Sequence, residues 1–135
     1  MEKQAKEISS WGDNVSELTA RINDEGWENS LKDWLIASNL KKDDALFILS
    51  VGGGNKKKNI STNLIKAIDH AKKTKSKIFG IVGKTDGYLY RKGDVVINIP
   101  YEDDKLVTPL SESFQAVVWH FLVSHPLLKK NKTKW

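Results

Sequence analysis

The hydrophobic residues of this chain form short apolar runs that alternate with segments of helical spacing. The runs at residues 45–51, 77–83 and 92–100 are partly β-branched and bounded by glycine or proline, which predicts three buried strands. The apolar residues between the first two runs recur at helical spacing and predict a helix over residues 61–74. Strands that alternate with helices indicate a parallel sheet, so the pattern predicts an α/β fold.

Two further helices and a short connection complete the predicted order. Apolar residues at helical spacing predict a helix over residues 26–40, and a short turn or helix is expected over residues 85–91. The last helix is expected to begin with Thr108 as N-cap and Pro109 at the first helical position, and to end at Pro126. Its predicted apolar stripe consists of Phe114, Val117, Val118, Phe121, Leu122 and His125.

The turn after the first strand is the clearest candidate for a binding site. Three consecutive glycines at 52–54 allow positive φ angles and a close approach of the backbone to a ligand. Ser61 or Thr62 follows at the N-cap of the next helix, where free N–H groups and the helix dipole favour an anion. The pattern predicts a phosphate site, although a flexible loop with solvated lysines at 56–58 explains the same residues.

The two common nucleotide motifs are not met in this turn. Asn55 rather than a lysine follows Gly54, which excludes the P-loop motif, and Lys57 stands where the dinucleotide motif has its last glycine. The turn therefore favours a smaller phosphorylated ligand.

Composition narrows the class of protein. The chain has 135 residues, 39% of them hydrophobic, which suits one domain over 1–135 with frayed ends at 1–12 and 129–135. It has no cysteine, and the charged N-terminus does not resemble a signal peptide, so the cytoplasm is expected and no membrane contact. The net charge of +5 rests on scattered lysines, which favours a solvated surface over nucleic-acid binding.

The order of these segments resembles the sugar isomerase (SIS) domain and, more narrowly, the phosphoheptose (sedoheptulose-7-phosphate) isomerase branch. Ser50 matches the first serine of that family's phosphate turn and Ser61 the last, with Asn63 two places on. The resemblance implies a three-layer α/β/α fold of flavodoxin type. It implies that a sugar phosphate is held by Ser50, Gly52, Gly53, Gly54, Ser61 and Thr62.

The resemblance extends to four further residues. Asn23 and Asp24 match a pair that touches the sugar, although a turn before the next helix explains them equally well. Gln115 matches a glutamine that reaches the ligand or a metal, and an ordinary boundary glutamine is the alternative. The family's catalytic histidine corresponds to Val123, so His125 on the apolar stripe is the candidate, with a packed core histidine as the alternative.

The resemblance covers only the C-terminal two-thirds of the family domain. The N-terminal helices and the first strand–helix unit, which carries the family's catalytic glutamate, have no counterpart here. A homo-oligomer or a second chain that completes the sheet is therefore expected. The resemblance implies zinc as a possible cofactor, with ligands unknown.

Two hypotheses follow for function. The first is a phosphosugar-isomerase-family protein whose catalysis is supplied by a second chain or lost. The second is a non-catalytic module that binds a sugar phosphate or a protein partner, which the missing glutamate and the displaced histidine favour.

Overall fold

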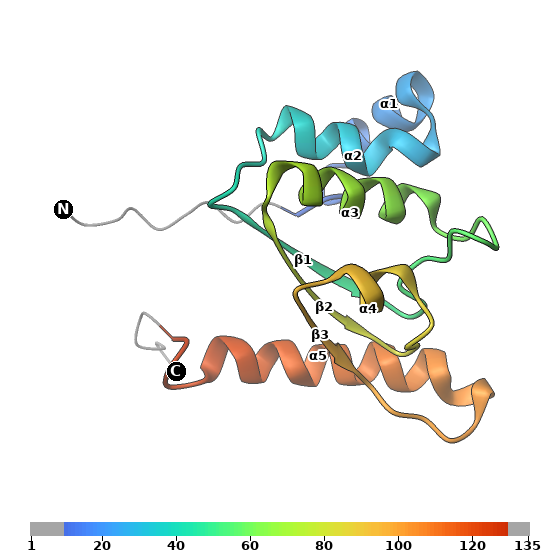
Figure 1. Cartoon of the computed structure of the whole chain (residues 1–135), viewed down its shortest axis with the longest axis vertical. Coiled ribbons are helices and arrows are strands. Elements are labelled where there is room, and N and C mark those ends of the chain that lie inside the picture. The colour runs from blue at the N-terminus through green and yellow to red at the C-terminus, as the bar shows by residue number, and fades with distance from the viewer. Residues whose placement is uncertain (1–9, 130–135) are drawn as a thin grey trace.

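Helices and strands alternate along the described part of the chain, residues 10–129 of the computed structural model (Figure 1). The elements are α1 (Val15–Glu25), α2 (Trp27–Ala37), β1 (Ala45–Ser50), α3 (Thr62–Thr74), β2 (Lys77–Val82), α4 (Tyr88–Lys92), β3 (Val95–Asn98), a 3₁₀ turn (Asp104–Leu106) and α5 (Val107–Ser124). Of the expected frayed ends at 1–12 and 129–135, residues 1–9 and 130–135 lie outside the described residues.

The three strands form one parallel sheet in the order β1-β2-β3. Their register aligns Ser50 with Val82 and Val82 with Asn98, so the strands end in one row. The sheet confirms the three strands and the α/β class predicted from the apolar runs.

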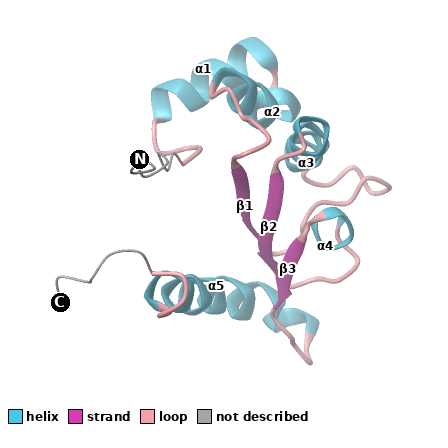
Figure 2. Ribbon diagram, turned by 60° about the vertical axis from the view of Figure 1, so that its left-hand side comes forward, coloured by secondary structure: helices cyan, strands magenta, loops and turns pink. Residues whose placement is uncertain are grey.

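Helices lie on both sides of the sheet (Figure 2). The α3 and α4 helices pack on one side, α5 packs on the other against β1 and β2, and the α1–α2 pair joins the α3 side through contacts of α2 with α3. This arrangement is the predicted three-layer α/β/α fold.

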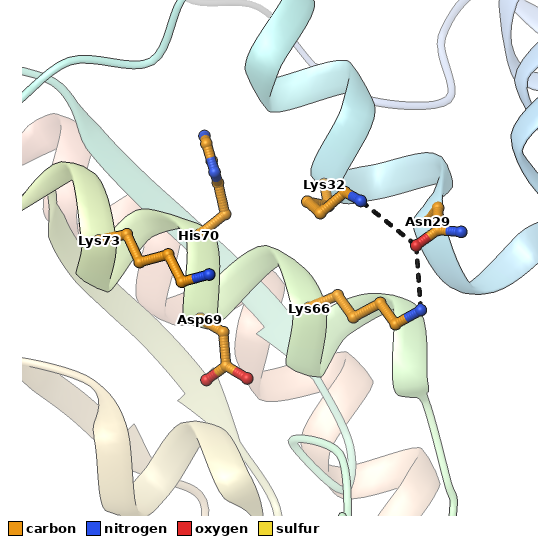
Figure 3. Close-up of a pocket in the computed structure, with 6 residues that line it drawn as sticks. All are labelled: Asn29, Lys32, Lys66, Asp69, His70 and Lys73. Atoms are coloured by element: carbon orange, nitrogen blue, oxygen red, sulfur yellow. Dashed lines mark hydrogen bonds between the residues drawn. The ribbon is translucent and has the colours of Figure 1, made fainter.

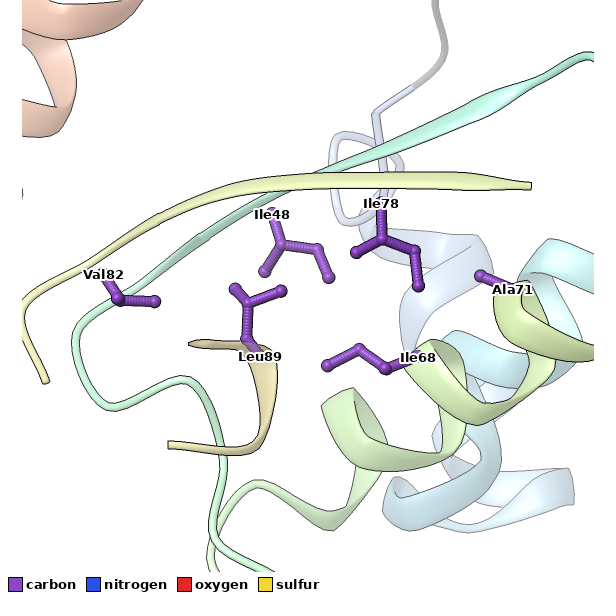
Figure 4. Packing of buried hydrophobic residues seen from close by; sticks show 6 residues of the cluster. All are labelled: Ile48, Ile68, Ala71, Ile78, Val82 and Leu89. Carbon is purple, nitrogen blue, oxygen red and sulfur yellow. The ribbon is translucent and has the colours of Figure 1, made fainter. Parts of the chain in front are cut away.

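The core lies between the sheet and the α3–α4 layer (Figure 4). Alternate residues of β1 and β2 point into it, as expected for a strand. Its fully or nearly fully buried members are Ile48, Ile68, Ala71, Ile78, Val82 and Leu89. This packing fixes α3 and α4 over one face of β1 and β2.

The helix predicted over residues 26–40 is shorter in the structure and has a second helix before it. Gly26, with φ at +76°, separates α1 from α2. The apolar residues of α1, Val15, Leu18 and Ile22, recur at helical spacing, so the sequence does carry a signal for this helix although none of its residues is buried.

Two other predicted boundaries are wrong by a few residues. The last helix begins at Val107 rather than after Thr108, because the 3₁₀ turn leads directly into it. The third strand is limited to Val95–Asn98, because residues 88–92 form α4. Boundaries shift in this way because adjacent turns compete for the same backbone groups.

Candidate functional site

The carboxyl edge of the sheet brings the loops after all three strands together. Ser50, Val82 and Asn98 end their strands in register, and the carbonyl oxygen of Val51 accepts hydrogen bonds from the N–H groups of Gly83 and Lys84 at 2.9 and 3.1 Å. Ligands of open α/β sheets bind outside this edge. The predicted phosphate turn therefore lies where the fold places binding sites.

The glycine turn after β1 is held in one conformation by hydrogen bonds. The Gly53 N–H donates to Ser50 Oγ at 3.0 Å. The carbonyl oxygens of Gly53 and Gly54 accept from the N–H groups of Leu89 and Tyr88 at 2.9 and 2.7 Å. Both glycines have positive φ, at +67° and +77°, which explains why glycine occupies these positions.

Burial divides the turn into a packed part and an open part. Gly53 and Gly54 are buried beneath α4 and α3, whereas Ser50 and Gly52 are half-buried. Among the described residues, none accepts a hydrogen bond from the Gly52 N–H. The open part thus offers a backbone N–H beside a serine hydroxyl.

The extra residues of the loop fold back on themselves. Asn55 and Ile60 form an antiparallel bridge with reciprocal hydrogen bonds of 2.9 and 3.0 Å, and Asn55 Oδ1 accepts from the Lys58 N–H at 3.0 Å. A Cβ atom on Gly54 would lie 3.5 Å from the Ser61 carbonyl oxygen. The hairpin over residues 55–60 therefore leaves the glycine turn next to the start of α3.

Ser61, one of the two predicted N-cap candidates, is the N-cap residue of α3, but its side chain does not cap the helix. Its backbone is left-handed, with φ at +51°, and its side chain makes no capping hydrogen bond. Ser61 is exposed and Thr62 half-buried. The first N–H groups of a helix have no intrahelical acceptor, so these residues can present donors to an anion.

The three loop lysines differ in their surroundings. Lys56 Nζ lies 3.6 Å from Asp69 Oδ2 and 5.5 Å from the centre of the Tyr88 ring. Tyr88 also donates a hydrogen bond to Asp69, which together with burial raises the pKa of Tyr88 to about 12. Lys57 and Lys58 are exposed, with no ion pair to another described residue. These two lysines remain available to a ligand.

A shallow pocket of about 270 Å³ opens at the carboxyl ends of β2 and β3. It is lined by Gly83, Thr85, Asn98, Pro100 and Tyr101. Sequence reasoning missed these residues. The signal that could have found them is the position of polar residues just after the two strands.

Asn23 and Asp24 are exposed near the end of α1, where the Asn23 amide donates to Asp24 Oδ1 at 3.0 Å. Both residues lie within α1 rather than in a turn that precedes α2. Among the described residues, α1 packs against α2, and no hydrogen bond joins this pair to the β1–α3 loop. The structure does not bring this pair to the predicted phosphate turn.

Gln115 is buried on the sheet-facing side of α5. Its Nε2 atom donates to the carbonyl oxygen of Ile81 at 3.3 Å, and its exposed fraction is 8%. Ile81 lies one residue before the end of β2. The side-chain amide of Gln115 therefore helps to hold α5 on the sheet.

His125 caps the C-terminal end of α5 and is exposed. Its Nδ1 accepts from the Leu127 N–H at 3.2 Å. Ten residues of helix rise about 15 Å, so His125 lies far along α5 from Gln115. Its predicted catalytic role gains no support from this position.

A second hollow, of about 260 Å³, lies between α2 and α3 and is rich in lysine (Figure 3). Two of its lysines are already engaged: Lys66 and Lys32 both donate to Asn29 Oδ1, at 3.0 and 3.4 Å. Lys66 also pairs with Glu28 at 3.1 Å. The hollow is therefore a surface network rather than a vacant anion site.

The described residues do not provide the metal site that the sequence resemblance implies. Within residues 10–129, no three histidine, aspartate or glutamate side chains are grouped so that they could hold a metal ion. Nor does any helix in this part of the chain have the length and apolarity needed to cross a membrane.

The same arrangement of elements occurs in solved phosphoheptose isomerases. The chain aligns with that of Francisella tularensis at a TM-score of 0.60 and 19% identity, over 80% of this chain and 55% of the other. The Neisseria gonorrhoeae enzyme gives a TM-score of 0.61 and 22% identity, over 80% and 56%. The chain has part of the phosphoheptose isomerase fold. This likeness confirms the predicted resemblance at the level of the fold, and the chain spans just over half of either isomerase.

No family model matches the chain. A sequence relative is the lincomycin biosynthesis protein LmbN of Streptomyces lincolnensis, which is 33% identical over an alignment of 118 residues that covers 84% of this chain. The match covers 41% of that protein, so the chain spans less than half of its length.

Proposed function

We propose that the chain binds the phosphate group of a sugar phosphate at the turn between β1 and α3. The observation that carries the proposal is the hydrogen bond that the Ser50 hydroxyl oxygen accepts within the turn. Its oxygen accepts the Gly53 N–H at 3.0 Å, which leaves the hydroxyl hydrogen free to donate to a phosphate oxygen. Donors that are fixed before binding cost little entropy when the ligand arrives.

The remaining donors come from the same turn and from α3. The Gly52 N–H has no acceptor among the described residues, and the hydroxyl of Ser61 is not used in capping. Thr62 adds a hydroxyl at the start of α3, where the helix dipole favours negative charge. Lys57 and Lys58 supply positive charge from the hairpin.

The sugar would extend from this turn into the pocket at the ends of β2 and β3. Thr85, Asn98 and Tyr101 line that pocket and carry hydroxyl and amide groups that can pair with sugar hydroxyls. The ligand class that fits both parts is a phosphorylated sugar, and sedoheptulose 7-phosphate is the proposed example. Its support is the likeness of the fold to solved phosphoheptose isomerases.

Isomerisation of a sugar phosphate needs a base and an acid at adjacent carbons. The sequence has no counterpart of the isomerase family's catalytic glutamate, so in this proposal a second chain supplies the proton transfer. β1 supports such a partner, because it is an edge strand of the described sheet and its Phe47 and Leu49, on the face turned away from α3, are 45% and 49% exposed.

A non-catalytic sugar-phosphate-binding module is the second candidate. The observation that favours it is the position of His125, which lies at the end of α5 and not at the carboxyl edge of the sheet. In this case the chain binds the phosphorylated sugar and converts nothing.

The test of binding is thermal unfolding of the full chain with sedoheptulose 7-phosphate, with inorganic phosphate and with unphosphorylated sedoheptulose. A ligand at a hundred times its Kd stabilises a protein by about 2.7 kcal/mol, which raises the Tm by several degrees. We expect this rise with the sugar phosphate, its loss in Ser50→Ala and Ser61→Ala, and its retention in Ser38→Ala, a control at an exposed serine after α2. Absence of a rise with either phosphate, or a rise that both site variants keep, would refute the proposal.

A further inference from the structure

The Asp69 carboxylate of α3 contacts a different residue with each of its two oxygens. Its Oδ1 atom accepts a hydrogen bond from the Tyr88 hydroxyl of α4 at 2.5 Å, and its Oδ2 atom lies 3.6 Å from Lys56 Nζ of the hairpin. Figure 3 shows this carboxylate turned away from α2. One side chain of α3 therefore connects α4 with the hairpin that separates the glycine turn from Ser61.

The Lys56 ammonium group meets a surface that is already formed by two other residues. Besides its ion pair with Asp69, it lies 5.5 Å from the centre of the Tyr88 ring, within the range of a cation–π contact. The hydrogen bond between Tyr88 and Asp69 holds the ring and the carboxylate together. Because these two side chains are ordered by each other, only Lys56 has to lose rotamer freedom when the contact forms.

The hairpin over residues 55–60 has few other contacts with α3 and α4. The bridge between Asn55 and Ile60 and the bond from the Lys58 N–H to Asn55 Oδ1 are internal to the hairpin. The Ile60 side chain is 52% exposed. Within the described part of the chain, Lys56 is the one hairpin residue whose side chain forms an ion pair or hydrogen bond with either helix.

Tyr88 connects this contact to the glycine turn. Its backbone N–H donates to the Gly54 carbonyl oxygen at 2.7 Å, while its hydroxyl donates to Asp69. The same residue thus holds the chain just before the hairpin and the carboxylate that contacts Lys56. With both points held, the distance that Lys57 and Lys58 can move from the glycine turn is limited.

We infer that Asp69 is a positioning residue that holds the hairpin against α3 and α4 through Lys56 and so keeps Lys57 and Lys58 near the phosphate turn. The part of this inference that concerns phosphate rests on the proposed function. A hairpin that is held in one place presents its charges to an anion without a further cost in entropy. A detached hairpin spreads the same charges over a larger volume and attracts the anion less.

The direction of the expected effect separates positioning from simple electrostatics. A carboxylate near an anion site repels the anion, so the loss of its charge in Asp69→Asn should strengthen phosphate binding if charge alone mattered. Positioning predicts weaker binding instead. The asparagine keeps an oxygen that accepts the hydrogen bond from Tyr88, and it lacks the charge that attracts Lys56.

The first test measures the backbone heteronuclear NOE of the hairpin in the full chain without ligand, which reports motion on the picosecond-to-nanosecond scale. We expect a clear fall at residues 57–59 in Asp69→Asn and in Lys56→Met. Lys56→Arg should keep the parent values, because a guanidinium pairs with a carboxylate and also lies on an aromatic ring. Glu112→Gln changes the net charge equally at an exposed position of α5 and should also keep them. Parent values in both Asp69→Asn and Lys56→Met would overturn the inference.

The second test is a mutant cycle of affinity for sedoheptulose 7-phosphate, measured by titration calorimetry at low salt. We expect Asp69→Asn to weaken binding about two- to fivefold, as the joint replacement of Lys57 and Lys58 by alanine does, and the triple variant to bind no more weakly than either. Losses that multiply, or tighter binding by Asp69→Asn, would overturn the positioning role. A parent chain that binds no sugar phosphate refutes the proposed function, while the NOE measurement still decides whether Asp69 holds the hairpin.

Discussion

The Cα atom of Gly87 lies against the carbonyl oxygen of Gly52, so closely that a Cβ atom on Gly87 would be 2.1 Å from that oxygen. This contact joins the start of α4 to the glycine turn after β1. Because α4 also donates to the carbonyl oxygens of Gly53 and Gly54, the turn depends on α4 for its shape.

We therefore expect Gly87→Ala to displace the turn. Overpacking of this kind lowers the free energy of unfolding by about 1–3 kcal/mol. The matched control is Gly52→Ala, since a Cβ atom there meets nothing within 4 Å. Urea unfolding of both variants measures the effect, and equal stability of the two would show that the contact relaxes freely.

The hydrogen bond from Tyr88 to Asp69 makes stability sensitive to alkaline pH. The pKa of Tyr88 is raised to about 12 in the folded chain, against about 10 when unfolded. The protonated phenol therefore stabilises the fold fully below pH 10, and this contribution is lost as the pH rises from 10 to 12.

Tyr88→Phe removes that contribution. We expect the variant to be less stable at pH 8 by about 1 kcal/mol and to lose stability less steeply above pH 10. Urea unfolding at a series of pH values gives both slopes. Parallel slopes for the variant and the parent chain would mean that Tyr88 does not hold its proton more tightly in the fold.

Replacement of both Lys57 and Lys58 by alanine separates binding from stability. Both side chains are exposed, so we expect an unchanged Tm and an affinity for sugar phosphate that falls about two- to fivefold at low salt. Titration calorimetry at two salt concentrations measures it. The control replaces Lys41 and Lys42, an exposed pair just before β1, and a similar loss of affinity there would indicate only a general charge effect.

Gln115→Ala distinguishes a structural glutamine from a ligand-binding one. It leaves the carbonyl oxygen of Ile81 without its side-chain donor in a buried place, so we expect a loss of about 1–3 kcal/mol in unfolding free energy. Affinity for sugar phosphate should stay the same, as in Ser113→Ala, an exposed control on the same helix. A stable variant with weakened binding would restore the role implied by the sequence resemblance.

The strands and the long helices could be predicted because their signals are local. The run at residues 45–51 is almost continuously apolar, which predicts a strand, and the helical spacing within α3 reflects its one buried face. α1 also has apolar residues at helical spacing, Val15, Leu18 and Ile22, although none of its residues is buried. The N-cap position of Ser61 was correct, while its missing capping bond depends on a left-handed backbone that the hairpin at 55–60 imposes.

The sequence by itself determined the three-stranded α/β order and the glycine turn beside a helix start, because strand, turn and helix signals act between neighbours in the chain. Only the tertiary structure decided which predicted site residues meet. Gly52 touches Gly87, and Gln115 reaches Ile81, across more than thirty residues in each pair, and His125 ends a helix away from the turn. Such contacts depend on how the layers pack, and packing of distant segments has no local period that a sequence displays.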